Sequence, residues 1–159
     1  LSMKKFQTPD LVAKETGKLV EQEVYLNLMR TAEEMKLHLV DLLAGFGLSG
    51  KQYNALRAIR RGGAEGETPS GIGAQMAEPR ADVTRLLDRL EREALVERRH
   101  DERDRRVVRV LLSKRGKKLL ADIDGPLLEL HRSQFMHMRQ EDLEALSRLL
   151  ILARSPTGL

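Results

Sequence analysis

Apolar residues in the first third of the chain recur at intervals of three and four, as on one side of a long helix. The clearest run extends from Leu28 to Phe46, and its spacing continues backward through Val24 and Val20. Asp10 is a suitable N-cap. We therefore expect a long helix within residues 10–46, and such a helix protrudes from a small domain unless another element packs along it.

The next stretch predicts a short helix, a loop and a second short helix. Ser49 is positioned to cap a helix over about residues 50–61. Glycine, proline and serine dominate residues 62–71, which is typical of a loop. Ser70 is positioned to cap a second helix, over about residues 72–77.

A third helix and two strands complete this central unit. Residues 81–93 place their leucines on one helical face, while residues 95–100 and 107–112 have the character of strands. The order of helices, loop, turn and hairpin over residues 49–112 is that of a winged helix-turn-helix.

The remainder is helical. Ser113 is positioned to cap a helix that extends beyond Leu130, and a last helix over about residues 141–154 has a broad apolar face. The helical regions over residues 10–46 and 113–154 thus flank the winged unit, and one copy has little with which to cover them. We expect residues 1–159 to form one mostly α-helical domain, with a small β-hairpin wing and long terminal helices that pair in a homodimer.

Positive charge is local rather than general. The chain carries a formal net charge of +4, but residues 97–118 hold ten Lys or Arg against four Asp or Glu. Because a modest net charge is weak evidence for a polyanionic partner, this concentration matters more than the total. The hexapeptide over residues 101–106, which joins the two strands, is its centre.

Composition excludes several classes of protein. The absence of cysteine excludes disulfides and thiol-ligated zinc. No stretch approaches the roughly 18 consecutive apolar residues of a membrane helix, and the first ten residues lack the apolar core of a signal peptide. We expect a cytoplasmic protein without a membrane partner.

Enzymatic chemistry has little support. No phosphate-binding glycine loop, nucleophile elbow or carboxylate dyad is present, so we expect no catalytic residue and no cofactor. The four histidines lack the helical spacing of metal ligands, and we expect no metal site. A zinc-responsive regulator that joins His38 to histidines of a later helix is the remaining metal alternative.

Four short motifs follow one another in the basic part of the chain. They are D-R-L-E at residues 88–91, L-V-E-R at 95–98, D-R-R at 104–106, and L-S at 112–113 with Gly116. In this order they resemble the MarR (multiple antibiotic resistance regulator) family of bacterial transcription factors. Ala94 departs from the family's usual glycine at a left-handed position, at a cost of roughly 1 kcal/mol.

The resemblance implies that residues 81–93 form a recognition helix, whose N-terminal residues reach base edges in the major groove. The residues expected there are Arg80, Ala81, Asp82, Thr84 and Arg85. For Asp82, a partner role at the positive end of the helix dipole is an alternative. Asp88 is expected to pair within the helix, with Arg85 or Arg92.

The resemblance also assigns roles to the hexapeptide. Its DNA-contacting residues would be Arg103, Asp104, Arg105 and Arg106. Arg106 would enter the minor groove, and Asp104 would orient it through an ion pair. Arg103 and Arg105 would contact phosphates or form the tip, while Asp101 would only reduce non-specific attraction. A plain solvated turn is the alternative.

Family members often hold small aromatic, phenolic or carboxylate effectors in a cleft between the dimer helices and the winged lobe. The residues on the helices that would line such a cleft are Met35, His38, Tyr53 and Arg57. The resemblance therefore implies a ligand-responsive repressor that binds double-stranded DNA at a pseudo-palindromic operator. A winged helix used for architecture or protein contact, without an operator, is the alternative.

Overall fold

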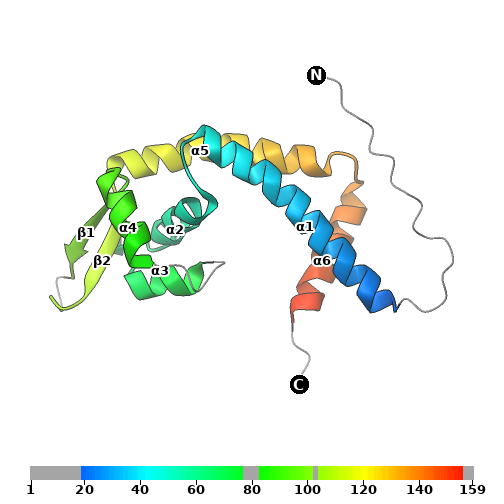
Figure 1. The fold of residues 1–159 in the computed structure, drawn as a ribbon, viewed down its shortest axis with the longest axis horizontal. Helices are drawn as coiled ribbons and strands as arrows, with labels where there is room; N and C mark the ends of the chain where they lie inside the picture. Colours follow the sequence, from blue (N-terminus) through cyan, green and yellow to red (C-terminus); the bar gives the residue numbers. More distant parts are fainter. Residues whose placement is uncertain (1–18, 77–82, 102–103, 156–159) are drawn as a thin grey trace. The chain divides into compact units, whose positions relative to one another are not determined.

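The structure is a computed structural model that describes residues 19–76, 83–101 and 104–155. The expected N-cap Asp10 and the start of the first predicted helix lie outside these residues. Along the chain the elements are α1 (Val20–Gly45), α2 (Gly50–Arg61), a short 3-10 helix (Gly63–Glu65), α3 (Pro69–Gln75), α4 (Val83–Arg92), β1 (Val96–His100), β2 (Val108–Leu112), α5 (Lys114–Phe135) and α6 (Gln140–Arg154) (Figure 1). Contacts divide the chain into two units, residues 1–34 and 35–159.

Helix α2 begins as its sequence predicts. The hydroxyl of Ser49 accepts a hydrogen bond from the backbone N–H of Gln52, and the Gln52 side chain accepts one from the Ser49 N–H. This reciprocal pair is a capping box, which satisfies two donors that a helix start otherwise leaves free. The predicted cap and bounds of this helix are confirmed.

The predicted loop over residues 62–71 contains more structure than expected. Thr68, rather than Ser70, caps α3: its hydroxyl accepts a hydrogen bond from the Gly71 N–H at 3.0 Å. Pro69 then occupies the first helical position, where its missing N–H costs nothing. The prediction of a helix over residues 72–77 capped by Ser70 was therefore wrong in both start and cap.

A third segment, at Glu67, pairs with the hairpin through an isolated β-bridge. β1 and β2 pair antiparallel with Val96 opposite Leu112. On the other side of β2, the backbone N–H and C=O of Glu67 bond to Val110 at 2.9 and 2.8 Å. Gly66 makes this approach possible, because its φ is +71° and an added Cβ would lie 2.6 Å from the Val110 carbonyl oxygen.

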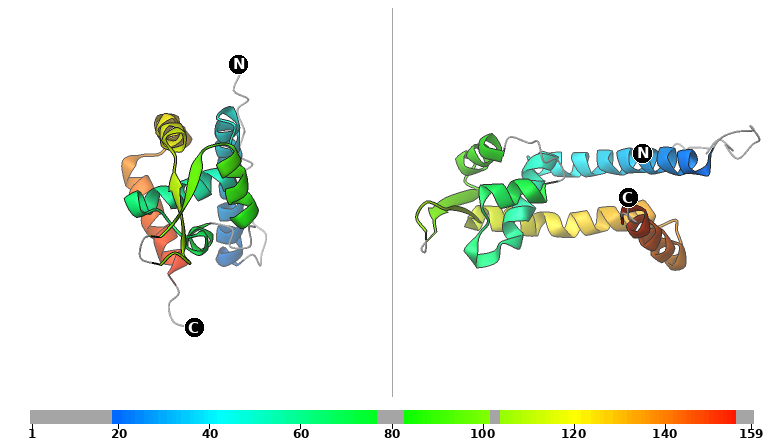
Figure 2. Two further views of the ribbon diagram at one scale, coloured as in Figure 1. Left: turned by 90° about the vertical axis from the view of Figure 1, so that its left-hand side faces the viewer. Right: turned by 90° about the horizontal axis from the view of Figure 1, so that it is seen from below.

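The core lies among α2, α3, α4, β2 and the first half of α5, all within residues 35–159 (Figure 2). Its largest fully buried side chains are those of Leu43, Leu56, Ile59, Ile72, Leu87, Leu90, Val110, Leu120 and Ile123. These are the residues that helical and strand periodicity direct inward. Leu43 of α1 and Leu120 and Ile123 of α5 share this core with α2, α3, α4 and the hairpin, which holds α4 and the hairpin in place.

Helices α1 and α6 bury far fewer side chains than α2 does. Helix α6, which is described in full, has no buried residue, and α1 has one, Leu43. None of the helices in the described residues has the length and apolar character that a membrane crossing requires. The exposed apolar surface of α1 and α6 is therefore available to another protein chain.

Candidate nucleic-acid interface

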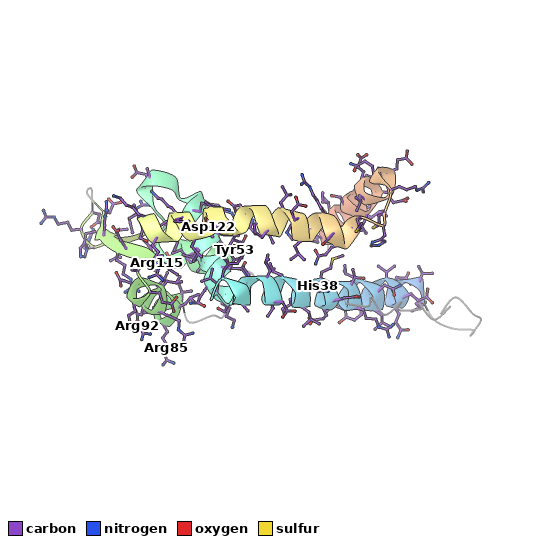
Figure 3. The ribbon with its side chains drawn as sticks, turned by 90° about the horizontal axis from the view of Figure 1, so that it is seen from above. His38, Tyr53, Arg85, Arg92, Arg115 and Asp122 are labelled. Carbon is purple, nitrogen blue, oxygen red and sulfur yellow. The ribbon has the colours of Figure 1, made fainter. Side chains whose placement is uncertain are left out.

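Helix α4 has one buried and one solvent-facing side. Leu87 and Leu90 are fully buried, with Val83 and Leu86 packed beside the core. Thr84 and Arg85 are exposed, and Figure 3 shows Arg85 and Arg92 projecting from the side of α4 that faces away from α5. Thr84 and Arg85 are thus placed as the sequence predicts. Arg80, Ala81 and Asp82 lie outside the described residues.

Arg98 of β1 joins the recognition-helix candidate to the hairpin. Its guanidinium donates to Asp88 at 2.7 Å and to Glu91 at 3.0 Å, both on α4. The prediction that Asp88 pairs within α4 was therefore wrong: a partner from the adjacent strand reaches it more favourably than a neighbour one turn away. The bridge fixes the base of the hairpin to α4 and offsets one of the two negative charges of Asp88 and Glu91.

Ala94 joins α4 to β1 in a left-handed conformation, with φ of 55°. Its carbonyl accepts a hydrogen bond at 2.7 Å from the hydroxyl of Ser113, which also caps α5 by accepting from the Gly116 N–H. The predicted left-handed position and the predicted cap are both confirmed. The chain adopts this conformation although the Cβ of alanine causes steric strain at positive φ.

We expect Ala94→Gly to raise the free energy of unfolding by about 1 kcal/mol, because glycine removes the Cβ strain at positive φ. Gly47, with φ of 72° and no atom within 4 Å of an added Cβ, offers the matched reverse change. Gly47→Ala should lower stability by a similar amount. Urea unfolding at one protein concentration measures both, and equal stability of Ala94→Gly and the parent would contradict the strain.

The described residues of the hexapeptide, 101 and 104–106, are joined by hydrogen bonds to one another and to the strand β2 that follows. The Asp101 carboxylate accepts hydrogen bonds from Arg109 Nε at 2.8 Å and from the Asp104 N–H at 3.2 Å. Its own N–H donates to the Val107 carbonyl at 2.9 Å. Asp101 therefore organises the wing, a role that the sequence analysis missed. The signal was an aspartate at the first position of a tight turn.

Arg106 and Asp104 form the predicted ion pair. Arg106 Nε and Nη2 donate to the two Asp104 carboxylate oxygens at 3.1 and 3.0 Å, and the Arg106 N–H donates to the same carboxylate. The Arg106 side chain remains 91% exposed. The pair with Asp104 orients the guanidinium. Arg105 is exposed beside it, and Arg103 lies outside the described residues.

Hydrogen bonds from the Arg106 side chain, and then from its backbone, hold the pKa of the Asp104 carboxyl below its usual value. Because the pKa is lower in the folded protein, the pair stabilises the turn at pH values above the ordinary carboxyl pKa. This contribution is lost as the pH falls through the lowered value. At neutral pH the Asp104 carboxyl is ionised and the pair is intact.

Of the four residues expected in an effector cleft, Tyr53 and Arg57 of α2 contact one another, while Met35 and His38 lie on α1. Tyr53 is 2% exposed, and the Arg57 guanidinium carbon lies 5.7 Å from the centre of its ring. On α1, Met35 is half-buried and His38 is exposed, and Figure 3 shows His38 and Tyr53 apart. Among the described residues, no three His, Cys, Asp or Glu side chains are arranged to hold a metal ion.

Comparisons with known proteins agree with this arrangement. A model of the MarR family matches residues 46–107. The HTH-type transcriptional regulator YwoH of Bacillus subtilis is 33% identical over 107 residues, which make up 67% of this chain and 76% of that protein. A MarR transcription factor from Planctomyces limnophilus is 38% identical, with a TM-score of 0.64 over 87% of this chain and 99% of that one.

The crystal structure of CouR from Rhodococcus jostii, bound to p-coumaroyl-CoA, is similar in fold. It is 22% identical, with a TM-score of 0.73 over 90% of this chain and 99% of its own. Motifs, winged lobe and relatives agree: the chain belongs to the MarR family of DNA-binding, winged-helix transcriptional regulators.

Proposed function

We propose that this protein is a ligand-responsive repressor that binds a pseudo-palindromic DNA operator as a homodimer. Residues 49–112 form its DNA-binding lobe, and residues 10–46 and 113–154 its dimerisation region. The observation that carries the proposal is the exposed Arg106, held by Asp104 on a turn that Asp101 braces, in a hairpin that Arg98 joins to α4. A guanidinium oriented in this way suits the minor groove when α4 occupies the major groove.

Dimerisation is supported by apolar surface that one chain leaves uncovered. Leu149, Ile151 and Leu152 on α6 are 57%, 55% and 63% exposed. Val24, Tyr25 and Leu37 on α1 are between 58% and 63% exposed. Soluble monomers rarely expose large contiguous apolar patches, so a second copy is the economical cover.

The DNA contacts follow from the placement of α4 and the wing. Arg85 can bond bidentately to guanine, and Thr84 can contact a thymine methyl group or a phosphate. Arg80, Ala81 and Asp82 extend this surface toward the helix start, while Arg103 and Arg105 contact phosphates beside the groove. Two such lobes in a dimer read half-sites about one helical turn apart, roughly 10 base pairs.

Footprinting on fragments of the source genome, at two or more salt concentrations, tests the proposal. We expect a protected site with two related half-sites, and an affinity that falls steeply with salt because phosphate contacts release counterions. A protein-contact or architectural module would instead show no palindromic site. A single asymmetric half-site, or affinity that does not depend on salt, would also contradict the proposal.

We expect Arg85→Ala to relax discrimination at one base pair of each half-site by about 1–3 kcal/mol, because a bidentate contact to guanine is lost. Competition binding against operators with single base substitutions measures this. Arg132→Ala is a charge-matched control, since Arg132 is exposed on α5 and pairs with Glu129. If Arg85→Ala weakened all sequences equally, Arg85 would be a phosphate contact and not a base reader.

We also propose that a small aromatic, phenolic or carboxylate effector releases the operator, with Met35, His38, Tyr53 and Arg57 as its contacts. The p-coumaroyl-CoA bound to CouR carries a phenolic acyl group, which supports a ligand with a phenolic part. Access to the Tyr53 ring requires Arg57 to move away from it. Thermal-shift screening of phenols and lipophilic acids, followed by operator release, tests the assignment.

A further inference from the structure

A cavity of about 400 Å³ lies away from the proposed DNA-binding and effector residues, within residues 35–159. Three parts of the chain line it: the link between α1 and α2, the end of α4, and one side of α5. The lining residues are Phe46, Gly47, Leu48, Glu93, Leu95, Arg115, Lys118, Leu119 and Asp122. None of Met35, His38, Tyr53 and Arg57 is among the lining residues. The volume falls in the lower part of the range of small-molecule sites, about 300–1,000 Å³.

Part of the cavity wall is apolar. Leu48 and Leu95 are 5% and 3% exposed, so they are held rigidly by the core, and Leu119 packs against the same core. Such a wall accepts a small aliphatic or aromatic group and gains free energy in proportion to the apolar area covered. The cavity therefore favours a ligand with an apolar part.

Arg115 provides a positive charge that the fold does not use. Its guanidinium makes no hydrogen bond or ion pair with any described residue, whereas Lys118 is paired with Asp122 at 2.7 Å. Arg115 also lies in the first turn of α5, which has no acidic residue. Because the helix dipole is positive at this end, a cation is disfavoured there and an anion is attracted. Because the Asp122 carboxylate on this wall is already paired with Lys118, the charge of Arg115 remains in excess and favours a ligand carboxylate.

Glu93 provides a negative charge on the α4 side of the cavity. Its carboxylate oxygens accept hydrogen bonds at 3.1 and 3.4 Å from the side-chain amide of Gln52, which carries no charge. Gln52 is 5% exposed and is fixed by the capping box of α2. The carboxylate is thus held in place but is not neutralised, which favours a ligand ammonium group.

We propose that this cavity binds a small zwitterion with an apolar side chain, of the class of the apolar α-amino acids. The ligand carboxylate bonds to Arg115 at the start of α5, and its ammonium group bonds to Glu93 at the end of α4. The side chain packs against Leu48, Leu95 and Leu119. The site rests on the cavity itself and does not depend on the proposed operator or effector.

Isothermal titration calorimetry of the full chain without DNA tests the site. We expect L-leucine or L-phenylalanine to bind once per chain. The matched compounds 4-methylpentanoate and 3-methylbutylamine each lack one of leucine's two charges, and each should bind at least about tenfold more weakly, because one charge-assisted contact is lost. Absence of binding by both amino acids would overturn the proposal.

Two variants and a control locate the binding. Arg115→Gln and Glu93→Gln should each lower the amino-acid affinity at least about tenfold. Lys117→Gln removes a neighbouring α5 charge that does not line the cavity, so it should leave the affinity unchanged. Equal effects of Arg115→Gln and Lys117→Gln, or equal binding of leucine and 4-methylpentanoate, would overturn the zwitterion site. Thermal melts of each variant verify that the fold is retained.

Discussion

Replacing both Leu149 and Leu152 by glutamate is expected to convert the protein to a monomer of about 18.0 kDa and to abolish operator binding. Both side chains lie on α6, which has no buried residue in the single chain. A leucine that becomes fully buried contributes about 1.5–3 kcal/mol, so the four leucines of a dimer contribute about 6 kcal/mol or more. Burying unpaired carboxylates adds a further penalty.

Light scattering coupled to size-exclusion chromatography measures this change, and operator titration measures its consequence. Arg148→Glu is the control, because it alters the net charge of α6 as much as the two leucine substitutions do. Its side chain is exposed and leaves the apolar surface intact, so it should remain dimeric. A double glutamate variant that stayed dimeric at micromolar concentration would exclude α6 from the dimer interface.

Arg106→Ala is expected to lower operator affinity by about 1.5–3 kcal/mol per half-site, the range of a hydrogen bond to a charged group. The loss should be greatest at operators with A/T-rich flanks, where the narrow minor groove concentrates negative potential. Preference among major-groove base pairs should change little, in contrast to Arg85→Ala. The Arg106 side chain is 91% exposed, so the substitution removes no core contact and stability should be preserved.

Two further wing variants distinguish the contribution of orienting the Arg106 guanidinium from the contribution of its charge to operator affinity. Asp104→Ala should lower operator affinity by part of the loss expected for Arg106→Ala, because the freed guanidinium must be ordered when DNA binds. Asp101→Ala should affect binding and wing order together, because both Arg109 and the Asp104 backbone lose their partner. Arg132→Ala again controls for charge. An Arg106→Ala variant with the parent's affinity at physiological salt would show that the wing is only a structured turn.

The sequence by itself determined the elements that local patterns encode. Ser49 caps α2, Ser113 caps α5, and Ala94 takes the left-handed position between α4 and β1. The hairpin strands and α6 lie within about one residue of their predicted ends. These features depend on the spacing of apolar residues and on hydrogen bonds over three or four residues, which the sequence displays directly.

The pairing of Asp104 with Arg106 was predictable for the same reason, since the two residues are only two positions apart in the turn and their motif resembles that of a known family. Placing Thr84 and Arg85 on the open side of α4 required only helical periodicity. Part of the candidate DNA-binding surface thus follows from local sequence alone.

Tertiary structure decided which distant groups meet. Arg98 takes Asp88 and Glu91 as partners only because β1 packs beside α4, and Glu67 bonds to Val110 only because the segment before α3 lies beside β2. The cavity between Glu93 and Arg115 likewise requires α4 and α5 to be brought together. Each of these partners lies outside the three or four residues that local patterns cover, and a charged side chain with several candidate partners pairs with the one that the packed core places nearest.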